Sequence, residues 1–528
     1  MTPLGKRLRA LAPELLAGIL RGVEKEGLRV KPDGTLADTP HPAQLGSALT
    51  HPSITTDFSE SQLELITGVH ADIDGCLREL SEIHQVVYRA LGNEMLWCSS
   101  MPCRLPADEQ IPIGRYGTSN VGRAKTVYRN GLSYRYGRRM QTISGIHYNF
   151  SLPEAAWPEL QRADGRQGPV AAYQSDAYFG LIRNFRRRSW LLLYLLGASP
   201  AVCSTFVAGR KHALQPLAEG TLCLPGATSL RMGPLGYQSD AQASLAVSFN
   251  GLKSYAASLH PALTGSYPLY EAIGIRNGDE YRQLATSLLQ IENEFYGTIR
   301  PKQRIFPGER PLHALGERGV EYVEVRCVDI DPFLPVGIDA RAMRLLDVFL
   351  LHCLLSDSPP DTPQEIENIS RNQHRVAGYG RETGLRLCHD GGERTLVEWG
   401  LELLEACAPI AEALDAAHQG DAYAEVLADA ERALRDASLT PSARVLQAMH
   451  EDHGDSYVAF AAAQSLRHRE AMLRAPLAPE AELRYARMAR ESFSEQRRIE
   501  ASDSVPFETY RQHYISQDLV GGAQLRSA

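Results

Sequence analysis

The chain has 528 residues, of which 44% are hydrophobic and 22% charged, a composition typical of a globular protein that buries a sizeable core. Its formal net charge of −8 argues against a nucleic-acid partner, which needs a basic face, but allows small anionic substrates at a locally basic site. Nine cysteines without a CxxC pair argue against a zinc ribbon or a disulfide framework, so we expect a reducing, cytoplasmic location.

The first segment, MTPLGKRLRALAPELLAGILRG, predicts an amphipathic helix rather than a targeting signal, because Pro13 and Glu14 interrupt its apolar part. The most apolar run, WLLLYLLGA at 190–198, is too short to cross a bilayer and predicts a buried helix. We therefore expect no contact with a membrane.

Strand-like and helix-like patterns mix over the first two thirds of the chain. The patterns predict strands at 21–30, 63–67, 142–152 and 322–330, and long helices at 76–92 and 281–297. Because strands and helices do not alternate regularly, we expect an α+β fold rather than a doubly wound sheet.

After about residue 340 the sequence becomes rich in Ala, Glu, Leu and Arg with helical periodicity, as in 422–454. We predict a catalytic core over 1–345 and a mostly helical region over 346–528 that packs on it. The alternative is one continuous domain. The helical region is expected to support the site rather than to supply most of it.

Each predicted strand has one apolar and one polar face, because side chains alternate along a strand. The polar faces carry Glu24 and Glu26 in the first strand, Glu64 in the second with Asp57 before it, His147 and Asn149 in the third, and Tyr322, Glu324 and Arg326 in the fourth. Taken alone, each of these fits a solvated face, a structural histidine or a helix cap. Together they place five carboxylates on faces that can converge.

Converging carboxylates need cations. Two such charges about 4–5 Å apart repel by roughly 3–4 kcal/mol at an effective dielectric constant near 20. Oxygen ligands with one imidazole suit Mg²⁺ or Mn²⁺ rather than zinc. Divalent ions next to arginines favour phosphoryl transfer from a nucleotide.

The usual nucleotide-binding motifs are missing from the sequence. GTSNVGRAKT at 117–126 has the glycine spacing of a P-loop, from Gly117 to Gly122, but Arg123 stands where the lysine belongs. No GxGxxG, HExxH or GxSxG motif occurs. A nucleotide site here would therefore be built on a sheet and metal ions.

Nine segments in order resemble the glutamate–cysteine ligase family, in particular its proteobacterial type. They are RGVEKEGLRV, LGSALTHPSITTDFSESQLELIT, LWCSSMPC, YGTSNVGRAKTVYRNGL, MQTISGIHYNFSLP, LLGASPAVCSTF, ATSLRMGPLGY, LQIENEFYGTIRPK and GVEYVEVRCVDIDPF. The resemblance runs from about residue 20 to 345 and continues more weakly through most of the helical remainder.

The resemblance implies a fold and a reaction. The fold would be similar to glutamine synthetase, with a curved, mainly antiparallel sheet that forms a funnel among helices. The reaction would use ATP and Mg²⁺ to phosphorylate the γ-carboxylate of L-glutamate. The amine of L-cysteine would then displace the phosphate and give γ-glutamylcysteine, in the first step of glutathione synthesis. The resemblance also implies a monomer and feedback inhibition by glutathione.

The resemblance further assigns roles to individual residues. The implied metal ligands are Glu24, Glu26, Asp57, Glu64, His147 and Glu324. The implied glutamate pocket contains Arg231, Tyr237, Tyr296 and Arg326, and Tyr128 with His147 falls where the family holds cysteine. Arg300 and Lys302 are candidates for phosphate contact or for a surface role. Glu324, Arg231 and Arg326 are expected to be catalytic.

Two positions depart from the family pattern as we expect it. Lys25 replaces arginine and should point away from the site, and Cys327 replaces serine as a small buried residue or a redox-sensitive thiol. A related ligase with another acceptor amine is the main alternative. A silent relative that only binds nucleotide or glutamate, and a helical scaffold, are further alternatives, but a scaffold leaves the acidic strands unexplained.

Overall fold

The computed structural model describes residues 2–236, 241–242, 245–306 and 308–516. Its α-helices are α1 Pro3–Ala10, α2 Pro13–Ala17, α3 Ile73–Ala90, α4 Asn120–Tyr136, α5 Ala156–Ala163, α6 Val170–Arg188, α7 Trp190–Leu196, α8 Leu252–Thr264, α9 Pro268–Ile273, α10 Pro311–Arg318, α11 Ala340–Leu355, α12 Pro363–Tyr379, α13 Leu396–His418, α14 Ala422–Arg435, α15 Pro441–His453, α16 Tyr457–Arg474, α17 Pro479–Ala501 and α18 Phe507–Ser516. Its strands are β1 Leu20–Val30, β2 Ile54–Thr56, β3 Gln62–Ile66, β4 Met95–Leu96, β5 Ile146–Ser151, β6 Ala201–Cys203, β7 Gln215–Ala218, β8 Thr221–Cys223, β9 Arg276–Asn277, β10 Glu280–Tyr281, β11 Ile299–Lys302, β12 Tyr322–Val328, β13 Arg386–His389 and β14 Gly392–Thr395. This mixture of strands and helices confirms the predicted α+β fold.

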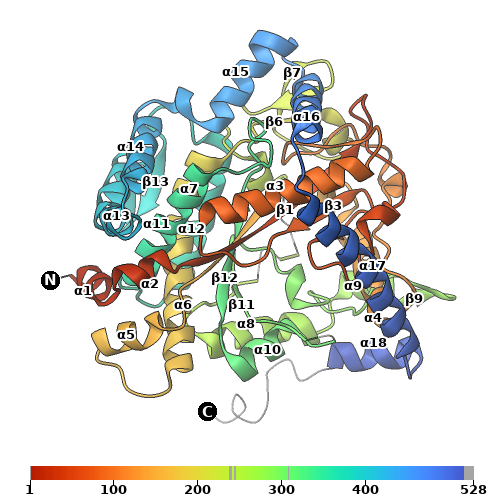
Figure 1. The fold of residues 1–528 in the computed structure, drawn as a ribbon, viewed down its shortest axis with the longest axis horizontal. Helices are drawn as coiled ribbons and strands as arrows, with labels where there is room; N and C mark the ends of the chain where they lie inside the picture. Colours follow the sequence, from red (N-terminus) through yellow and green to blue (C-terminus); the bar gives the residue numbers. More distant parts are fainter. Residues whose placement is uncertain (1, 237–240, 243–244, 307, 517–528) are drawn as a thin grey trace.

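A central antiparallel sheet organises the molecule (Figure 1). Within the described residues it has seven strands in the order β11-β12-β5-β1-β3-β2, and β4 pairs with β1. The sheet is open, since β11 and β2 are its two edges. The strands at its centre, β1 and β5, come from segments more than a hundred residues apart, so the sheet brings distant polar residues together.

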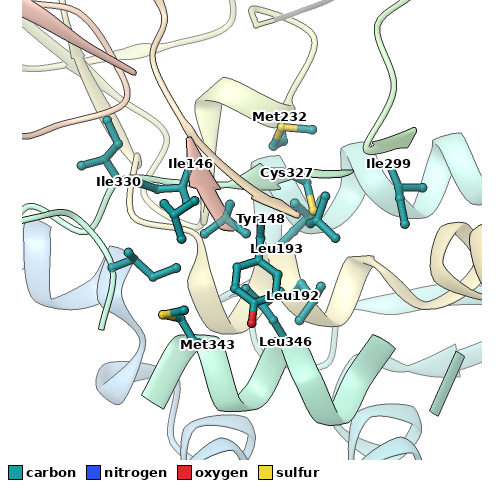
Figure 2. Close-up of a cluster of buried hydrophobic side chains, with 14 of the residues drawn as sticks. Ile146, Tyr148, Leu192, Leu193, Met232, Ile299, Cys327, Ile330, Met343 and Leu346 are labelled. Carbon is teal, nitrogen blue, oxygen red and sulfur yellow. The ribbon is translucent and has the colours of Figure 1, made fainter. Parts of the chain in front are cut away.

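The apolar face of the sheet packs against helices. Figure 2 shows Ile146 and Tyr148 of β5 beside Leu192 and Leu193 of α7 and Leu346 of α11. All of these side chains are buried. On the same side of the sheet α3 contacts β1 and β3. Burial of this face leaves the polar face of the same strands for the site.

The predicted strands and most predicted helices are present. The strand expected at 142–152 is shorter, because Met140–Thr142 forms a 3-10 turn before β5 begins at Ile146. The amphipathic helix expected at the start is divided into α1 and α2, since Pro13 disfavours helical backbone at the residue before it. The run at 190–198 contains the buried helix α7, as predicted.

The helix predicted at 281–297 is wrong. This segment contains the end of β10, irregular backbone and a 3-10 turn at Glu292–Glu294. Its carbonyl groups at Ala285 and Leu288 accept hydrogen bonds from the guanidinium of Arg135 on α4, and Gln290 accepts from the amide of Leu284. These tertiary hydrogen bonds replace the helical ones, so tertiary contacts override the local periodicity.

The C-terminal region is mostly helical, as predicted, and packs on the sheet-bearing part. Helix α16 contacts α3, α17 contacts the 3-10 turn Ala43–Leu45, and α18 contacts α4. The predicted division at residue 345 falls inside α11. A separate catalytic core over 1–345 and helical region over 346–528 remain a prediction.

Candidate active site

The strand register places the predicted polar residues on one face of the sheet. Glu24 of β1 lies opposite His147 of β5, and Glu26 lies opposite Glu64 of β3. Glu324 of β12 pairs with residues in both of its neighbouring strands, Asn149 in β5 and Arg300 in β11. Residues that pair directly across a sheet project from the same face. The alternation predicted from the sequence is therefore correct in these strands.

His147 connects the side chains at the centre of this face. Its Nδ1 lies 3.2 Å from Glu24 Oε2, and its Nε2 lies 3.6 Å from Glu26 Oε1. Arg326 Nη1 lies 3.5 Å from His147 Nδ1 and 2.9 Å from Glu324 Oε2. The imidazole therefore stands between two carboxylates of β1 and the guanidinium of β12.

One group in the described chain brings three potential metal ligands together. A ligand atom from each of Glu24, Glu64 and His147 lies within 4.8 Å of the other two. Beside them, Asn149 Nδ2 donates to Glu24 Oε1 at 2.9 Å, whereas its buried Oδ1 accepts no hydrogen bond from the described residues. Oxygen atoms with one imidazole nitrogen form a donor set that fits Mg²⁺ or Mn²⁺.

The other three predicted metal ligands surround this group. Glu26 Oε2 accepts a hydrogen bond from the amide of Gly145 at 2.8 Å. Glu324 forms ion pairs with Arg326 and with Lys302, whose Nζ is 2.9 Å from Oε1. Asp57 lies just after β2 rather than on a strand, and its charge contributes to raising the pKa of Glu26 and of Glu64. The structure thus brings ligand atoms from three of the six predicted residues within 4.8 Å of one another.

The carboxyl groups at the β1–β3 end of the face resist ionisation. Burial, together with the charges of Glu24 and Asp57, raises the pKa of Glu64 well above its usual value. Burial also raises the pKa of Glu26, despite the opposing effect of His147. Like charges are therefore held close together without enough positive charge to balance them, which is the electrostatic condition that a bound cation relieves.

The carboxyl groups nearer β12 have the opposite behaviour. Burial alone would raise the pKa of Glu324, but the charges of Lys302 and Arg326 outweigh it and hold that pKa well below its usual value. Burial also opposes ionisation of Glu24, yet its hydrogen bond with His147 and the charge of Lys302 lower its pKa. The negative charges of Glu24 and Glu324 are therefore already balanced by neighbouring basic side chains.

The residues predicted for the glutamate pocket are only partly described. Arg231 is buried and donates through Nη2 to the carbonyl of Arg326 at 2.6 Å. Tyr296 accepts a hydrogen bond from Gln141 Nε2 at 3.0 Å, and burial raises the pKa of its phenol. Tyr237 lies outside the described residues. The guanidinium of Arg231 therefore contacts the backbone of the strand that carries Arg326.

Tyr128, the residue predicted to hold cysteine, lies on α4. Burial and the charge of Glu294 raise the pKa of its phenol well above the usual value, so the hydroxyl stays protonated. The charge of Arg300, on β11, has the opposite effect on this pKa but is outweighed. Tyr128 therefore belongs to the β11 side of the site.

Arg300 and Lys302 lie on β11, beside Glu324. Arg300 donates to the carbonyls of Asn293 and Phe295, and burial with the charge of Arg326 lowers its pKa to about 10. The charge of Glu324 overcomes burial and raises the pKa of Lys302. Both residues therefore lie next to Glu324, and the choice between phosphate contact and a surface role stays a prediction.

Two basic residues of α4 are missed by the sequence analysis. Arg129 donates through Nε to the carbonyl of Asp57, and its guanidinium lies over the ring of Tyr116. Lys125, one turn earlier, also lies over Tyr116, and burial lowers its pKa to about 8. Their i, i+4 spacing, which places two side chains on one face of a helix, is a signal that could have identified them.

Residues of the C-terminal region contact the P-loop-like segment at 117–126. The amide of Thr118 donates to Glu500 Oε1 at 2.9 Å, and the amide of Asn120 donates to Asp503 Oδ2 at 2.7 Å. Arg123 lies over the ring of Phe507. Because carboxylates already occupy the start of α4, this segment does not cradle a phosphate.

The two departures from the family pattern lie on the opposite face. Lys25 is buried, and its Nζ lies 2.9 Å from Nε2 of His84 on α3. Cys327 is buried in the hydrophobic cluster of Figure 2, and burial raises the pKa of its thiol to about 12. Cys327 is therefore a small core residue rather than a reactive thiol.

Comparisons with known proteins extend over most of the chain. The family model for glutamate–cysteine ligase matches residues 7–376. Glutamate–cysteine ligase from Pseudomonas entomophila (strain L48) is 51% identical over 509 residues, 96% of each chain. Its counterpart from Pseudomonas aeruginosa (strain UCBPP-PA14) is 51% identical over 496 residues, 94% of each chain. The similarity thus continues through the C-terminal helices.

Solved structures give the same result. Glutamate–cysteine ligase from Francisella tularensis, crystallised in complex with AMP, has a TM-score of 0.89 and 36% identity, and covers 94% of this chain and 97% of that one. A bifunctional glutathione synthetase from Pasteurella multocida has a TM-score of 0.69 and 26% identity, and covers 92% of this chain and 57% of that one. Among the described residues, no helix is long and apolar enough to cross a membrane. The chain therefore belongs to the glutamate–cysteine ligase family, whose members are enzymes of the ligase class.

Proposed function

We propose that the polar face of the central sheet ligates L-glutamate to L-cysteine with ATP and Mg²⁺, which Mn²⁺ can replace. The γ-carboxylate of glutamate attacks the terminal phosphate of ATP and becomes an acyl phosphate. The amine of cysteine then displaces that phosphate and gives γ-glutamylcysteine, ADP and phosphate, the first step of glutathione synthesis. The convergence of Glu24, Glu64 and His147 beside the Glu324–Arg326 pair is the observation that carries this proposal.

The proposed metal ligands are the residues whose donor atoms fit a hard divalent ion: Glu24, Glu26, Asp57, Glu64, His147 and Glu324. The raised pKa of Glu64 and the buried Asn149 oxygen without a donor both support a cation at this place. A bound divalent ion supplies charge neutralisation to the phosphates of the nucleotide. The carboxylates of β1 and β3 would hold this ion.

Arg326 and Arg231 are proposed to bind the glutamate carboxylate and to stabilise charge on the transferred phosphoryl group. The two guanidinium groups are on neighbouring segments, since Arg231 donates to the carbonyl of Arg326. Tyr296 and Tyr237 would complete this pocket. The cationic Arg300 and Lys302, which neighbour Glu324, would lie along the phosphate chain.

Tyr128 and His147 are proposed to hold the cysteine substrate. The phenol of Tyr128 remains a hydrogen-bond donor at neutral pH because its pKa is raised. Glutathione contains the γ-glutamylcysteine unit of the product, so we propose that it occupies the same pocket and inhibits the enzyme. We also propose that the enzyme is a cytoplasmic monomer, a location that suits its nine free cysteines.

The reaction is tested by phosphate release from ATP, Mg²⁺ and L-glutamate, with and without L-cysteine, and by the mass of the product. We expect cysteine-dependent release and γ-glutamylcysteine. If phosphate release is faster with another amine than with cysteine, that amine would replace cysteine as the acceptor in this proposal. No release with any amine would contradict the ligase reaction.

The metal site is tested separately by thermal unfolding with and without Mg²⁺. A ligand at 100 times its Kd stabilises the folded state by about 2.7 kcal/mol, so saturating Mg²⁺ should raise Tm measurably. The Glu64→Gln variant should lose most of this shift. A Lys211→Gln variant serves as the control, because Lys211 is exposed and outside the site. An equal shift in all three proteins would contradict the proposed ligands.

A further inference from the structure

The guanidinium of Arg231 is held in a narrow space next to Gly145. A Cβ atom added to Gly145 would lie 2.1 Å from Arg231 Nη2 and 2.4 Å from its Cζ. The φ angle of Gly145 is outside the left-handed region, so its backbone conformation is open to any residue. A side chain at this position would therefore displace the guanidinium of Arg231.

Gly145 also contacts the acidic part of the site. Its amide donates to Glu26 Oε2 at 2.8 Å, and the amide of Glu26 donates to its carbonyl at 3.0 Å. One residue thus touches a proposed metal ligand through its peptide group and the substrate-binding arginine through its Cα. This arrangement sets the distance between the carboxylates and the guanidinium.

A buried carboxylate lies on the other side of the arginine. Asp329, which follows β12, places Oδ1 3.7 Å from Arg231 Nη1, and both side chains are buried. Its Oδ2 accepts hydrogen bonds from Ser199 Oγ at 2.5 Å and from the amide of Ala198 at 2.9 Å. Its Oδ1 accepts from Ser229 Oγ at 3.0 Å. Three hydrogen bonds therefore fix the position of the carboxylate that faces Arg231.

These partners come from three separate segments of the chain. Ser199 follows α7, Ser229 immediately precedes the 3-10 turn Leu230–Met232 that carries Arg231, and Asp329 follows the strand that carries Arg326. Ser199 and Ser229 are themselves joined by an isolated parallel bridge. The carboxylate thus joins the loop after α7 to the segment before Arg231, at the end of the strand that carries Arg326.

We propose that Asp329 is a positioning residue for glutamate binding, and that it holds the guanidinium of Arg231 in the space left by Gly145. This inference rests on the proposed role of Arg231 in the glutamate pocket. Asp329 itself does not touch substrate. It aligns the arginine and favours one orientation of a side chain that would otherwise have several.

The first test is the Asp329→Asn variant, which keeps the size of the side chain and removes its charge. We expect the KM for L-glutamate to rise about ten- to a hundredfold, because the variant removes the buried charge partner that lies 3.7 Å from Arg231 Nη1. The KM for ATP should change little, and kcat should change less than the KM for glutamate. A residue with a structural role alone would not separate these constants.

The matched control is Asp347→Asn. Asp347 is also a buried aspartate paired with an arginine, Arg21, but it lies on the apolar side of the sheet. This variant should lose stability and keep the KM for glutamate. If Asp329→Asn does not fold, Ser229→Ala removes one of the anchoring hydrogen bonds and should raise the same KM to a smaller extent. An unchanged glutamate KM in the folded variants would overturn the inference.

The second test is Gly145→Ala, with Gly420→Ala as its control, because a Cβ at Gly420 meets no atom within 4 Å. Gly145→Ala should also raise the KM for glutamate, whereas the control should not. In an Arg231→Ala background, Asp329→Asn should have no further effect on this KM. Independent, additive effects would overturn the inference.

The two proposals fail differently. If Arg231→Ala leaves the KM for glutamate unchanged, the proposed role of Arg231 fails and the inference fails with it. If Arg231→Ala raises this KM but Asp329→Asn and Gly145→Ala do not, only the positioning role is overturned. A rise in all three variants supports both.

Discussion

Both faces of β1 carry buried charged residues, but the charges are arranged differently on the two faces. On the helix-covered face, Arg21 pairs with Asp347 at 3.1 Å, and the hydroxyl of Tyr148 donates to the same carboxylate at 2.7 Å. On the other face, Glu26 lies directly across from Glu64. The first arrangement balances opposite charges, and the second brings like charges together.

This difference separates structural charge from functional charge. Burial raises the pKa of Asp347, but the charge of Asp347 overcomes burial of Arg21 and raises the pKa of the guanidinium, which therefore stays charged beside its partner. Burial and neighbouring carboxylates raise the pKa of Glu64, which means that its surroundings oppose ionisation. A protein keeps such an unfavourable group when a ligand relieves it. Variants on the two faces should therefore have opposite effects on stability and activity.

The largest effect is expected for Glu64→Gln. Because this variant removes a proposed metal ligand, kcat should fall by about a thousandfold, comparable to the loss of one important electrostatic group at an active site. The loss of repulsion should leave the free energy of unfolding unchanged or increase it. Steady-state kinetics and urea denaturation measure the two quantities. Full activity combined with lost stability would show that Glu64 has a structural role rather than a functional one.

Asp347→Ala should have the opposite outcome. Removing one partner of a buried ion pair costs about 3–5 kcal/mol, because the remaining charge is left without a partner. We expect the free energy of unfolding to fall by this amount, and kcat/KM to stay near the wild-type value at temperatures where the variant is folded. A loss of kcat in the fully folded variant would show that the two faces are not separate.

Arg326→Lys tests the balanced end of the polar face. Arg326 contacts Glu324 and His147, and lysine cannot reproduce its planar set of donors. We expect kcat/KM to fall by about a hundredfold, with little change in stability because the positive charge remains. Pre-steady-state phosphate release can show whether the acyl-phosphate step is the one affected. A variant with wild-type kinetics would remove Arg326 from the proposed mechanism.

The smallest effect is a pH dependence on the helix-covered side. Burial and the charge of Arg188 lower the pKa of His352, in α11, to about 3, from an ordinary value of 6.5. The folded protein therefore keeps this histidine neutral, whereas the unfolded chain binds a proton below pH 6.5. Between pH 7 and pH 5 the folded state should lose about 2 kcal/mol through this group. The contribution is present above pH 6.5 and disappears as the pH falls toward 3.

His352→Leu isolates this contribution. Wild type and variant are compared by urea denaturation at pH 7 and at pH 5. The variant should lose about 2 kcal/mol less than wild type between the two values, since other buried histidines affect both proteins equally. The same loss in both proteins would assign the acid sensitivity to other groups.

The sequence predicts the polar face well because a strand has a simple geometry. Alternation at every second residue selects Glu24, Glu26, His147 and Glu324, and pairing of the strands brings them to one side. The apolar runs likewise predict the faces that pack on helices. Family resemblance adds Arg231 and the tyrosines, which no local pattern indicates.

Contacts between distant segments account for what the sequence does not predict. The segment 281–297 has helical periodicity, but its carbonyl groups bind Arg135, which is about 150 residues earlier in the chain. Lys125 and Arg129 lie on α4, where the sequence patterns predict no helix, and the packing of α4 places both over Tyr116 and brings Arg129 to the carbonyl of Asp57. Neither fact can be obtained from a local window of sequence.

The closure of α4 by Glu500 and Asp503 has a consequence for how the protein is made. Both carboxylates are more than 380 residues beyond the amides that they accept from, Thr118 and Asn120. During synthesis the sheet can form long before these residues leave the ribosome. The helix that carries Tyr128, Lys125 and Arg129 gains these two contacts only after residues 500–503 have been synthesised. A polypeptide interrupted before residue 500 would therefore carry the acidic strands while the start of this helix lacks both hydrogen bonds.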